Sequence, residues 1–433
     1  MKTVILDGSA ATDILGQSVR TELLRQLHAQ SHTVESFTLR ENKIGNCVGD
    51  FLCWVRRPGM CNTDDDNRTI AAAIVRADLL IYLSPITFGG YSATLKKATD
   101  HQIQNIAPFF TTLNGETHHT RRYQHYPNFL VIGWQPAANP TAESIFRHLA
   151  WRNSINFYAP TWHCEVVTGT PPDADLVGQI EAALTAIARQ QPDPQPALPP
   201  RRAPMALTTP PQRALLLVGS PRGQNSTSHS IGAYLMAQLA TRGLQTETAL
   251  LYPALNAPQK LDALLTQIAS ADLTLLSFPL YVDTLPAPVI YLLEQLAAHR
   301  TAPPNQGGSM AVLVNCGFPE WQHAENVLAL CAEFAAQTGL HWLGALALGA
   351  GQGMVNGMPL HQIGGQVIPL KKALALAAQS LAQGQPIPAE AQAFIEKPFV
   401  PAWLYRLLGG LGWKQQAKRW GVQNDLRRRP YLS

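Results

Sequence analysis

Short apolar runs alternate with longer amphipathic stretches along the first half of the chain. Residues 2–8 form a run rich in β-branched side chains, residues 18–30 repeat apolar positions with a helical period, and residues 33–39 alternate as a strand does. This order predicts a strand, a helix and a second strand. The pattern continues, with further strands expected at 77–85, 128–134 and 161–168 and helices at 67–76, 92–102 and 141–154. A last helix, after the strand at 161–168, is expected to end at about residue 191.

A proline-rich stretch, residues 189–213, interrupts this order. Proline removes a backbone donor and favours an extended chain, so the stretch is typical of a linker between two domains. Beyond it the order begins again. The strands expected in the second half are 214–220, 245–252, 272–280, 309–317 and 341–349, and the helices are 228–243, 259–271, 288–300, 323–339 and 370–383.

The chain is thus expected to have four parts. They are a first domain at 1–188, the linker at 189–213, a second domain at 214–390 and a C-terminal segment at 391–433. Strands that alternate with helices predict an α/β fold, here two doubly wound five-stranded parallel sheets in tandem with helices on both faces. Ligands of such sheets bind beyond the carboxyl ends of the strands, where the strand order reverses. The loops that follow the first, third and fourth strands of each half are therefore the candidate ligand loops.

Composition agrees with two domains and narrows the function. With 46% hydrophobic residues in 433, the chain can form more than one core, because single cores seldom exceed roughly 250 to 300 residues. A net charge of +4 is too small to indicate a nucleic-acid partner, and six cysteines are too few for a secreted disulfide scaffold. The N-terminus shows no export signal and no stretch is apolar enough to span a bilayer, so we expect a soluble, cytoplasmic protein.

The first loop of the second domain, residues 219–228, is rich in hydrogen-bond donors. It offers four hydroxyl side chains and one guanidinium, those of Ser220, Ser226, Thr227, Ser228 and Arg222. Together with the amides of a helix N-terminus, these groups can surround a phosphate. An ordinary helix cap is the alternative, but a cap needs only one hydroxyl. The loop lacks the lysine of a nucleotide-triphosphate loop and the glycine spacing of a dinucleotide loop.

This loop resembles the FMN-phosphate loop of the flavodoxin-like NAD(P)H-dependent FMN reductases, whose relatives include the iron–sulfur flavoproteins. Pro221 and Asn225 belong to the resembling stretch. Two further loops of the second domain are similar to the family's flavin-ring loops, one at Pro279, Leu280, Tyr281 and Val282 and the other at Asn315, Gly317 and Phe318. The resemblance implies bound FMN, NAD(P)H as the electron donor and a flavodoxin-like fold.

The first domain resembles the family less evenly. Its third-strand loop is similar to a ring loop through Ser84, Pro85, Ile86, Thr87, Phe88 and Gly89. Its first loop has no proline–arginine pair, and only Ser9, Thr12 and Ser18 remain as side-chain donors. A second FMN is therefore expected less securely here, and a structural copy that has lost its cofactor is the alternative.

Three cysteines, Cys47, Cys53 and Cys61, lie in one loop of the first domain. The resemblance implies a four-cysteine cluster at this place, but Asp50 stands where the second cysteine would fall. Iron–sulfur clusters and structural zinc sites normally take four ligands, so we expect no cluster and no metal. Asp50 or a nearby histidine could supply the missing ligand.

Two segments remain outside these motifs. Residues 110–123 carry two histidines and two arginines, and we expect a solvated loop that acts as a lid. The C-terminal segment combines basic residues with Trp403, Trp413 and Trp420. It could lie on a membrane surface, or form a helical hairpin on the second domain or on a partner subunit; no nucleic-acid motif accompanies its charge.

The resemblance implies an enzyme that passes electrons from a nicotinamide to a quinone, a flavin or a similar acceptor. Hydride transfer to a flavin needs no side-chain acid, base or nucleophile, so we predict no catalytic residue. The alternative is an FMN-binding electron-transfer protein without nicotinamide activity.

Overall fold

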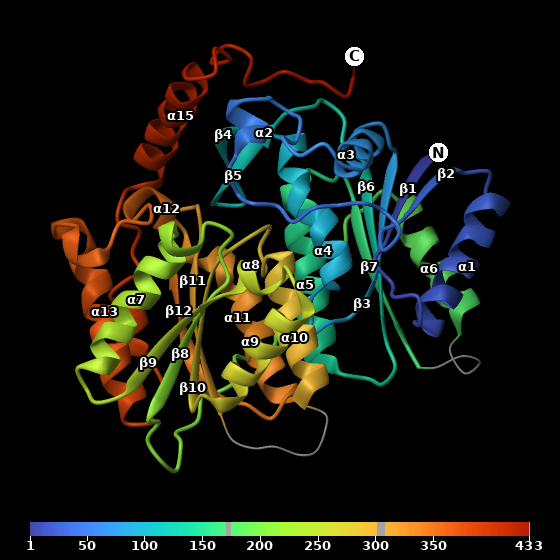
Figure 1. The fold of residues 1–433 in the computed structure, drawn as a ribbon. Coiled ribbons are helices and arrows are strands. Elements are labelled where there is room, and N and C mark those ends of the chain that lie inside the picture. The colour runs from blue at the N-terminus through green and yellow to red at the C-terminus, as the bar shows by residue number, and fades with distance from the viewer. Residues whose placement is uncertain (170–174, 301–307, 433) are drawn as a thin grey trace. The chain divides into compact units, whose positions relative to one another are not determined.

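A computed structural model describes residues 1–169, 175–300 and 308–432. The chain forms two compact units. The first contains Met1–Pro199 together with Trp403–Ser433, and the second contains Pro200–Ala402. Each unit is built on one parallel sheet with helices on both sides (Figure 1). The predicted pair of doubly wound, flavodoxin-like sheets is therefore confirmed.

The sheet of the first unit has the strand order β2-β1-β3-β6-β7, and all its neighbours are parallel. Its strands are β1 (Lys2–Asp7), β2 (Thr33–Thr38), β3 (Leu79–Pro85), β6 (Asn128–Gln135) and β7 (Trp162–Thr168). The strand order reverses beside β1, since β2 lies on one side of it and β3 on the other. A ligand of this sheet would bind beyond the ends of β1 and β3.

Alternate residues of these strands face opposite helix layers. Val4 and Leu6 of β1 pack under α3 (Asn67–Val75), α4 (Ala93–Asp100) and α5 (Pro140–Asn156). Ile5, between them, packs under α1 (Ile14–Ala29) and α6 (Leu176–Ala188) on the other face. This two-residue period with apolar side chains on both faces explains why the central strands β1, β3 and β6 are continuous apolar runs.

The first unit has one feature that differs from the prediction. Residues 110–123, expected as a solvated lid, belong largely to an antiparallel hairpin of β4 (Ile106–Leu113) and β5 (Glu116–Arg121). Thr117 and His118 are buried. The turn is Asn114–Gly115, with φ angles of 50° and 84°. Because Asn-Gly favours the left-handed backbone of a tight hairpin turn, the strands pair here instead of forming an open loop. The first unit also contains the short helices α2 (Leu52–Val55) and η1 (His101–Asn105).

The second unit repeats the architecture. Its strand order is β12-β11-β10-β8-β9, again parallel and with the reversal beside the first strand, β8. The strands are β8 (Arg213–Val218), β9 (Gln245–Leu250), β10 (Leu273–Pro279), β11 (Ser309–Asn315) and β12 (His341–Leu348). The longer helices are α7 (Thr227–Ala240), α9 (Pro258–Ser270), α10 (Ala287–Arg300), α11 (Glu325–Gln337) and α13 (Ile368–Ala382). Short helices are η2 (Gly223–Asn225), α8 (Leu251–Ala254), η3 (Trp321–Ala324), α12 (Gly351–Met354), η4 (Leu360–Gln362), η5 (Gly365–Val367) and α14 (Ala389–Ala393).

The C-terminal segment contains one long helix, α15 (Ala402–Lys418), followed by an irregular tail. From Trp403 onward it belongs to the first unit, not to the second as one prediction had it. The reason is aromatic packing: Trp413 of α15 lies 5.2 Å, centroid to centroid, from both Phe51 and Trp54. Buried Arg122 also donates hydrogen bonds to the carbonyls of Leu426 and Arg428. Among the described residues, no helix has the length and apolarity needed to cross a bilayer.

Candidate functional site

The loop between β8 and α7 ends in a well-formed helix cap. The hydroxyl of Ser226 accepts a hydrogen bond from the backbone N–H of His229 at 3.0 Å and donates one to the carbonyl of Gly223 at 2.6 Å. Ser226 thus serves as the N-cap residue of α7. The amides of the helix's first turn have no acceptor within the helix, and they carry its positive dipole.

Beyond the cap, the loop holds more hydroxyls than the fold uses. Thr227 is 3% exposed and its hydroxyl has no hydrogen-bond partner within the described structure. The hydroxyl of buried Ser220 accepts only a long contact, 3.4 Å, from the N–H of Arg222. An unpaired buried hydroxyl is costly unless a ligand or water satisfies it. These donors fit a phosphate, and the exposed Arg222 and Asn225 stand at the rim of the same loop.

The third hydroxyl, Ser228, is tied to the neighbouring strands. The side-chain amide of Asn315 donates to its hydroxyl at 2.9 Å, and the hydroxyl of Ser277 donates to its carbonyl at 2.8 Å. Because a hydroxyl that accepts a bond still has its own proton to donate, Ser228 remains available to a ligand. The network fixes the start of α7 against the ends of β10 and β11, where the predicted ring loops begin.

The first ring loop of the second domain is a tight turn. Tyr281 and Thr284 exchange backbone hydrogen bonds of 2.9 and 3.1 Å across Val282 and Asp283. Those two central residues have φ angles of 49° and 59°. Such a backbone is costly for β-branched Val282, and strain of this kind concentrates at binding sites. Leu280, half-buried like Pro279, donates its N–H to the carbonyl of Asn315 at 2.9 Å.

The second ring loop follows β11. The N–H of Cys316 donates to the carbonyl of Leu348, and the thiol of Cys316 donates to the carbonyl of Phe318 at 3.1 Å. Gly317 is exposed, with open space where a side chain would lie. Phe318 is half-buried, and its ring lies 4.8 Å from that of His323, centroid to centroid, in a tilted arrangement. The fold therefore brings the three predicted loops of the second domain to one edge of the sheet.

The ring loop of the first domain has the same backbone pattern. Thr87 and Gly90 exchange hydrogen bonds across Phe88 and Gly89, which have φ angles of 54° and 90°. Ile86 donates to the carbonyl of Trp134 on the next strand, as Leu280 does in the second domain. Ser84 and Pro85 end β3. The hydroxyl of Ser84 is buried, accepting from the N–H of Ser92 and donating to the carbonyl of Pro85.

The first loop of the first domain is built differently. Asp7, 1% exposed at the end of β1, accepts from the N–H of Ser9 at 2.9 Å. Two guanidinium groups approach its other oxygen, Arg20 at 3.5 Å and Arg40 at 3.8 Å. Arg40 also donates to the carbonyl and the hydroxyl of Ser9. A carboxylate of the protein itself therefore engages the cationic groups that a phosphate would need.

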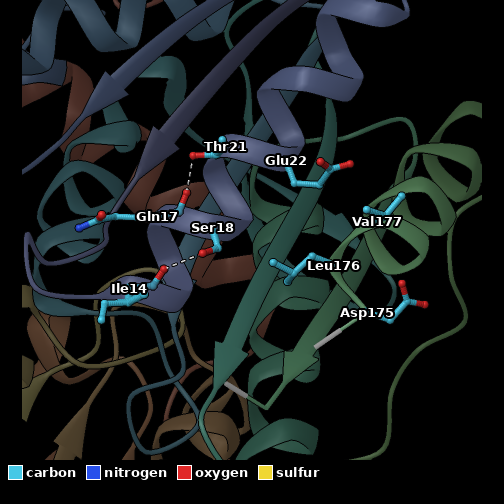
Figure 2. Close-up of a pocket in the computed structure, with 8 residues that line it drawn as sticks. All are labelled: Ile14, Gln17, Ser18, Thr21, Glu22, Asp175, Leu176 and Val177. Atoms are coloured by element: carbon cyan, nitrogen blue, oxygen red, sulfur yellow. Dashed lines mark hydrogen bonds between the residues drawn. The ribbon is translucent and has the colours of Figure 1, made fainter. Parts of the chain in front are cut away.

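A second carboxylate caps α1. Asp13 accepts from the N–H of Gly16 at 2.9 Å and from the indole of Trp134 at 2.7 Å. Ser18, predicted as a donor, bonds back to the carbonyl of Ile14 at 3.0 Å (Figure 2). Its helix face borders an open groove between α1 and α6, lined by Ile14, Gln17, Ser18, Thr21, Glu22, Asp175, Leu176 and Val177 (Figure 2). The two carboxylates make the helix start of the first domain unfavourable for an anion.

The three cysteines of the first domain line a small cavity together with Asp50 and a histidine that sequence reasoning had not named, His101. The sulfur of Cys61 lies 3.5 Å from Nδ1 of His101, whose Nε2 donates to the carbonyl of Gly45. Burial opposes ionisation of Cys61, but the hydrogen bond and charge of His101 together with the hydrogen bonds from Thr63 lower the pKa of this thiol. Burial raises the pKa of Cys47 to about 12. The expectation that no metal binds here stays a prediction.

Residues 1–114, about a quarter of the chain, match the family profile described as NADPH-dependent FMN reductase. Comparison with curated protein sequences gave no match. A solved flavone reductase is 12% identical; the match covers 40% of this chain but only 65%, less than two thirds, of that protein, with a TM-score of 0.31.

Two further solved structures are similar over one domain's length. An NAD(P)H:quinone oxidoreductase from Methanothermobacter marburgensis is 14% identical over 40% of this chain and 95% of its own, with a TM-score of 0.30. An FMN-dependent NADH-azoreductase from Bacillus anthracis, solved with FMN, is 13% identical over 39% and 99%, with a TM-score of 0.30. Through residues 1–114 this chain is similar to the NADPH-dependent FMN reductases, and it carries the doubly wound flavodoxin-like sheet twice.

Proposed function

We propose that the protein is an FMN-dependent oxidoreductase that takes electrons from NAD(P)H and passes them to a quinone, a flavin or a similar small acceptor. The flavin binds in the second domain. The family match of residues 1–114 supports the reaction class. The position of the flavin is supported by the polar groups at the start of α7.

The observation that carries this position is the buried hydroxyl of Thr227, which lacks a partner within the described structure. It lies at the N-terminal end of a helix, where a dianionic phosphate is most favourable. Thr227, Ser220 and Ser228 would donate to the phosphate oxygens, and Arg222 would add a charge-assisted bond. Ser226 holds the helix start in place by capping it.

The two ring loops would hold the flavin ring in the second domain. Tyr281, Val282 and Phe318 are half-buried, so they can contact a ring without leaving a large apolar surface in water. Bound FMN would supply hydride uptake from the nicotinamide and electron delivery to the acceptor. The protein's part is to bind and orient the ring and to shield it from water, and we assign no catalytic residue.

The test is the visible spectrum of the purified full chain, its flavin-to-protein ratio and its response to NADH and NADPH without oxygen. We expect oxidised-flavin bands, a ratio near one flavin per chain and bleaching by at least one nicotinamide. A protein that cannot be loaded with FMN would refute the proposal. Bound flavin that neither nicotinamide bleaches would instead indicate an electron-transfer protein.

A further inference from the structure

Helix α15 has one face that packs on the first unit. The ring of Tyr405 lies 5.5 Å from that of Phe110, and Trp413 packs against Phe51 and Trp54. Gly409 lies between them, and a Cβ there would come within 2.4 Å of the Phe110 ring. Glycine is therefore required for this close approach and does not break the helix.

The opposite face of α15 is apolar and exposed. Trp403, Leu407 and Leu411 recur every four residues and are 63%, 56% and 56% exposed, and Leu408 beside them is 54% exposed. Residues four apart lie on the same face of a helix, so these side chains form one stripe. A contiguous apolar stripe on a soluble surface marks an interaction site.

Helix α15 and the tail that follows it are strongly basic. Helix α15 contains no Asp or Glu, and the whole stretch 403–432 has Asp425 as its single acid. Its basic residues are Arg406, Lys414, Lys418, Arg419, Arg427, Arg428 and Arg429. Lys414 and Lys418 are exposed and continue the side of the helix that bears Leu407 and Leu411.

We propose that the stripe Trp403, Leu407, Leu408 and Leu411, with Lys414 and Lys418 beside it, docks this protein onto the surface of an anionic lipid bilayer. An amphipathic helix with Trp and Leu on one side and Lys or Arg beside them lies in the headgroup layer, where anionic lipids attract its cations. Lipid is favoured over a second copy of this chain, because pairing two such faces would bring the same positive charges together. The proposal does not depend on the flavin assignment.

The experiment is flotation of the full chain with vesicles of phosphatidylcholine, with and without phosphatidylglycerol. We expect binding only to the vesicles that contain phosphatidylglycerol. Leu407→Gln/Leu411→Gln should weaken vesicle binding about tenfold or more, because two leucine side chains that would be buried in the lipid are lost. Val177→Gln, at another exposed apolar residue, is the matched control and should bind like the parent. Lys414→Gln/Lys418→Gln should weaken binding and reduce its sensitivity to salt.

Several outcomes would overturn the proposal. These are no binding to anionic vesicles, equal binding to neutral ones, or binding that survives both double substitutions. A dimer in light scattering that Leu407→Gln/Leu411→Gln converts to monomer, with no vesicle binding by the parent, would assign the stripe to contact between copies instead. Circular dichroism of each variant verifies its fold, which exposed positions should not disturb.

Discussion

The two domains share one backbone design but differ at the point where a phosphate would bind. In both, the third strand ends in a turn with two left-handed residues, Phe88 and Gly89 in one and Val282 and Asp283 in the other. At the helix start, however, the first domain has the carboxylates of Asp7 and Asp13 and the second has hydroxyls. The same turn after the third strand therefore occurs with two different sets of side chains at the helix start.

The sequence similarity and the proposed phosphate site fall in different domains. The family match falls in the first domain, while the groups best suited to a phosphate lie in the second. Overall sequence similarity reports mainly on strands, helices and turns, which both domains need in order to fold. Binding depends on a few polar groups at one helix end, which a family match over 114 residues can miss.

The largest expected effect comes from placing an acidic residue at the cap of α7, as Asp13 caps α1 in the first domain. Ser226→Asp keeps a good helix cap but places a carboxylate beside the proposed phosphate. Two unit charges about 4 Å apart repel by about 4 kcal/mol at an effective dielectric constant near 20, so FMN affinity should fall roughly a hundredfold or more. Fluorescence titration with FMN measures this. Ser226→Asn, a neutral cap of the same shape, is the control, and equal affinity of both variants would contradict the phosphate site.

The second prediction concerns the internal ion cluster of the first domain. Asp7→Asn removes the buried carboxylate that faces Arg20 and Arg40, and we expect the free energy of unfolding to fall by about 2 kcal/mol. This is below the usual cost of breaking a buried pair, because the two arginine side chains are 33% and 28% exposed. Urea unfolding gives the change in stability. The flavin-to-protein ratio should not change, and a reduced ratio would place a flavin in the first domain.

Removal of the Arg222 guanidinium from the loop between β8 and α7 should have a smaller effect on FMN affinity. Arg222→Ala deletes a charge-assisted contact of about 1.5 to 3 kcal/mol. Since Arg222 is exposed and water weakens its attraction, we expect about a tenfold loss of FMN affinity, near the lower end of that range. Arg242→Ala, on the exposed end of the same helix region, serves as the control. Unchanged flavin retention after dialysis of Arg222→Ala would remove this residue from the site.

The substitution with the smallest expected effect tests the hydroxyl of Thr227, which has no partner within the described structure. Thr227→Val keeps the shape and removes the hydroxyl, so FMN affinity should fall about fivefold to tenfold while the stability of the flavin-free protein stays within about 0.5 kcal/mol. Ser230→Ala is the contrast, because its hydroxyl donates to the carbonyl of Met358 and its loss should destabilise the flavin-free protein. If Thr227→Val destabilised the flavin-free protein and left affinity unchanged, the hydroxyl would have a structural role.

The sheets could be predicted from the sequence because their central strands are continuous apolar runs between helical periods. Residues 79–85 and 273–279, for example, form strands within two residues of the predicted ends. The hairpin of β4 and β5 was missed, although Asn114–Gly115 is a strong turn signal. Its strands carry polar residues such as Thr111 and His119, so the apolar alternation that marks a strand was weak.

Only part of the difference between the loops after β1 and β8 could be predicted from the sequence. The missing arginine of the first domain could be read directly, but the contact of Asp7 with Arg40 joins residues 33 positions apart. It exists because β1 and β2 are neighbours whose carboxyl ends meet at one edge. The pairing of Cys61 with His101 has the same origin, since it depends on how η1 packs under the cysteine loop. Local periodicity carries no information on such contacts.

The position of the C-terminal tail has a consequence for how the protein is made. The second unit lies within the chain of the first, so residues 403–432 are synthesised after the second unit and complete the domain that was begun first. At about 5 to 20 residues per second, the intervening 200 or so residues take roughly 10 to 40 seconds to synthesise. During that time Trp54, Phe110 and Arg122 lack their final partners. A premature stop codon between positions 403 and 432 would therefore remove part of the N-terminal domain and leave the second unit whole.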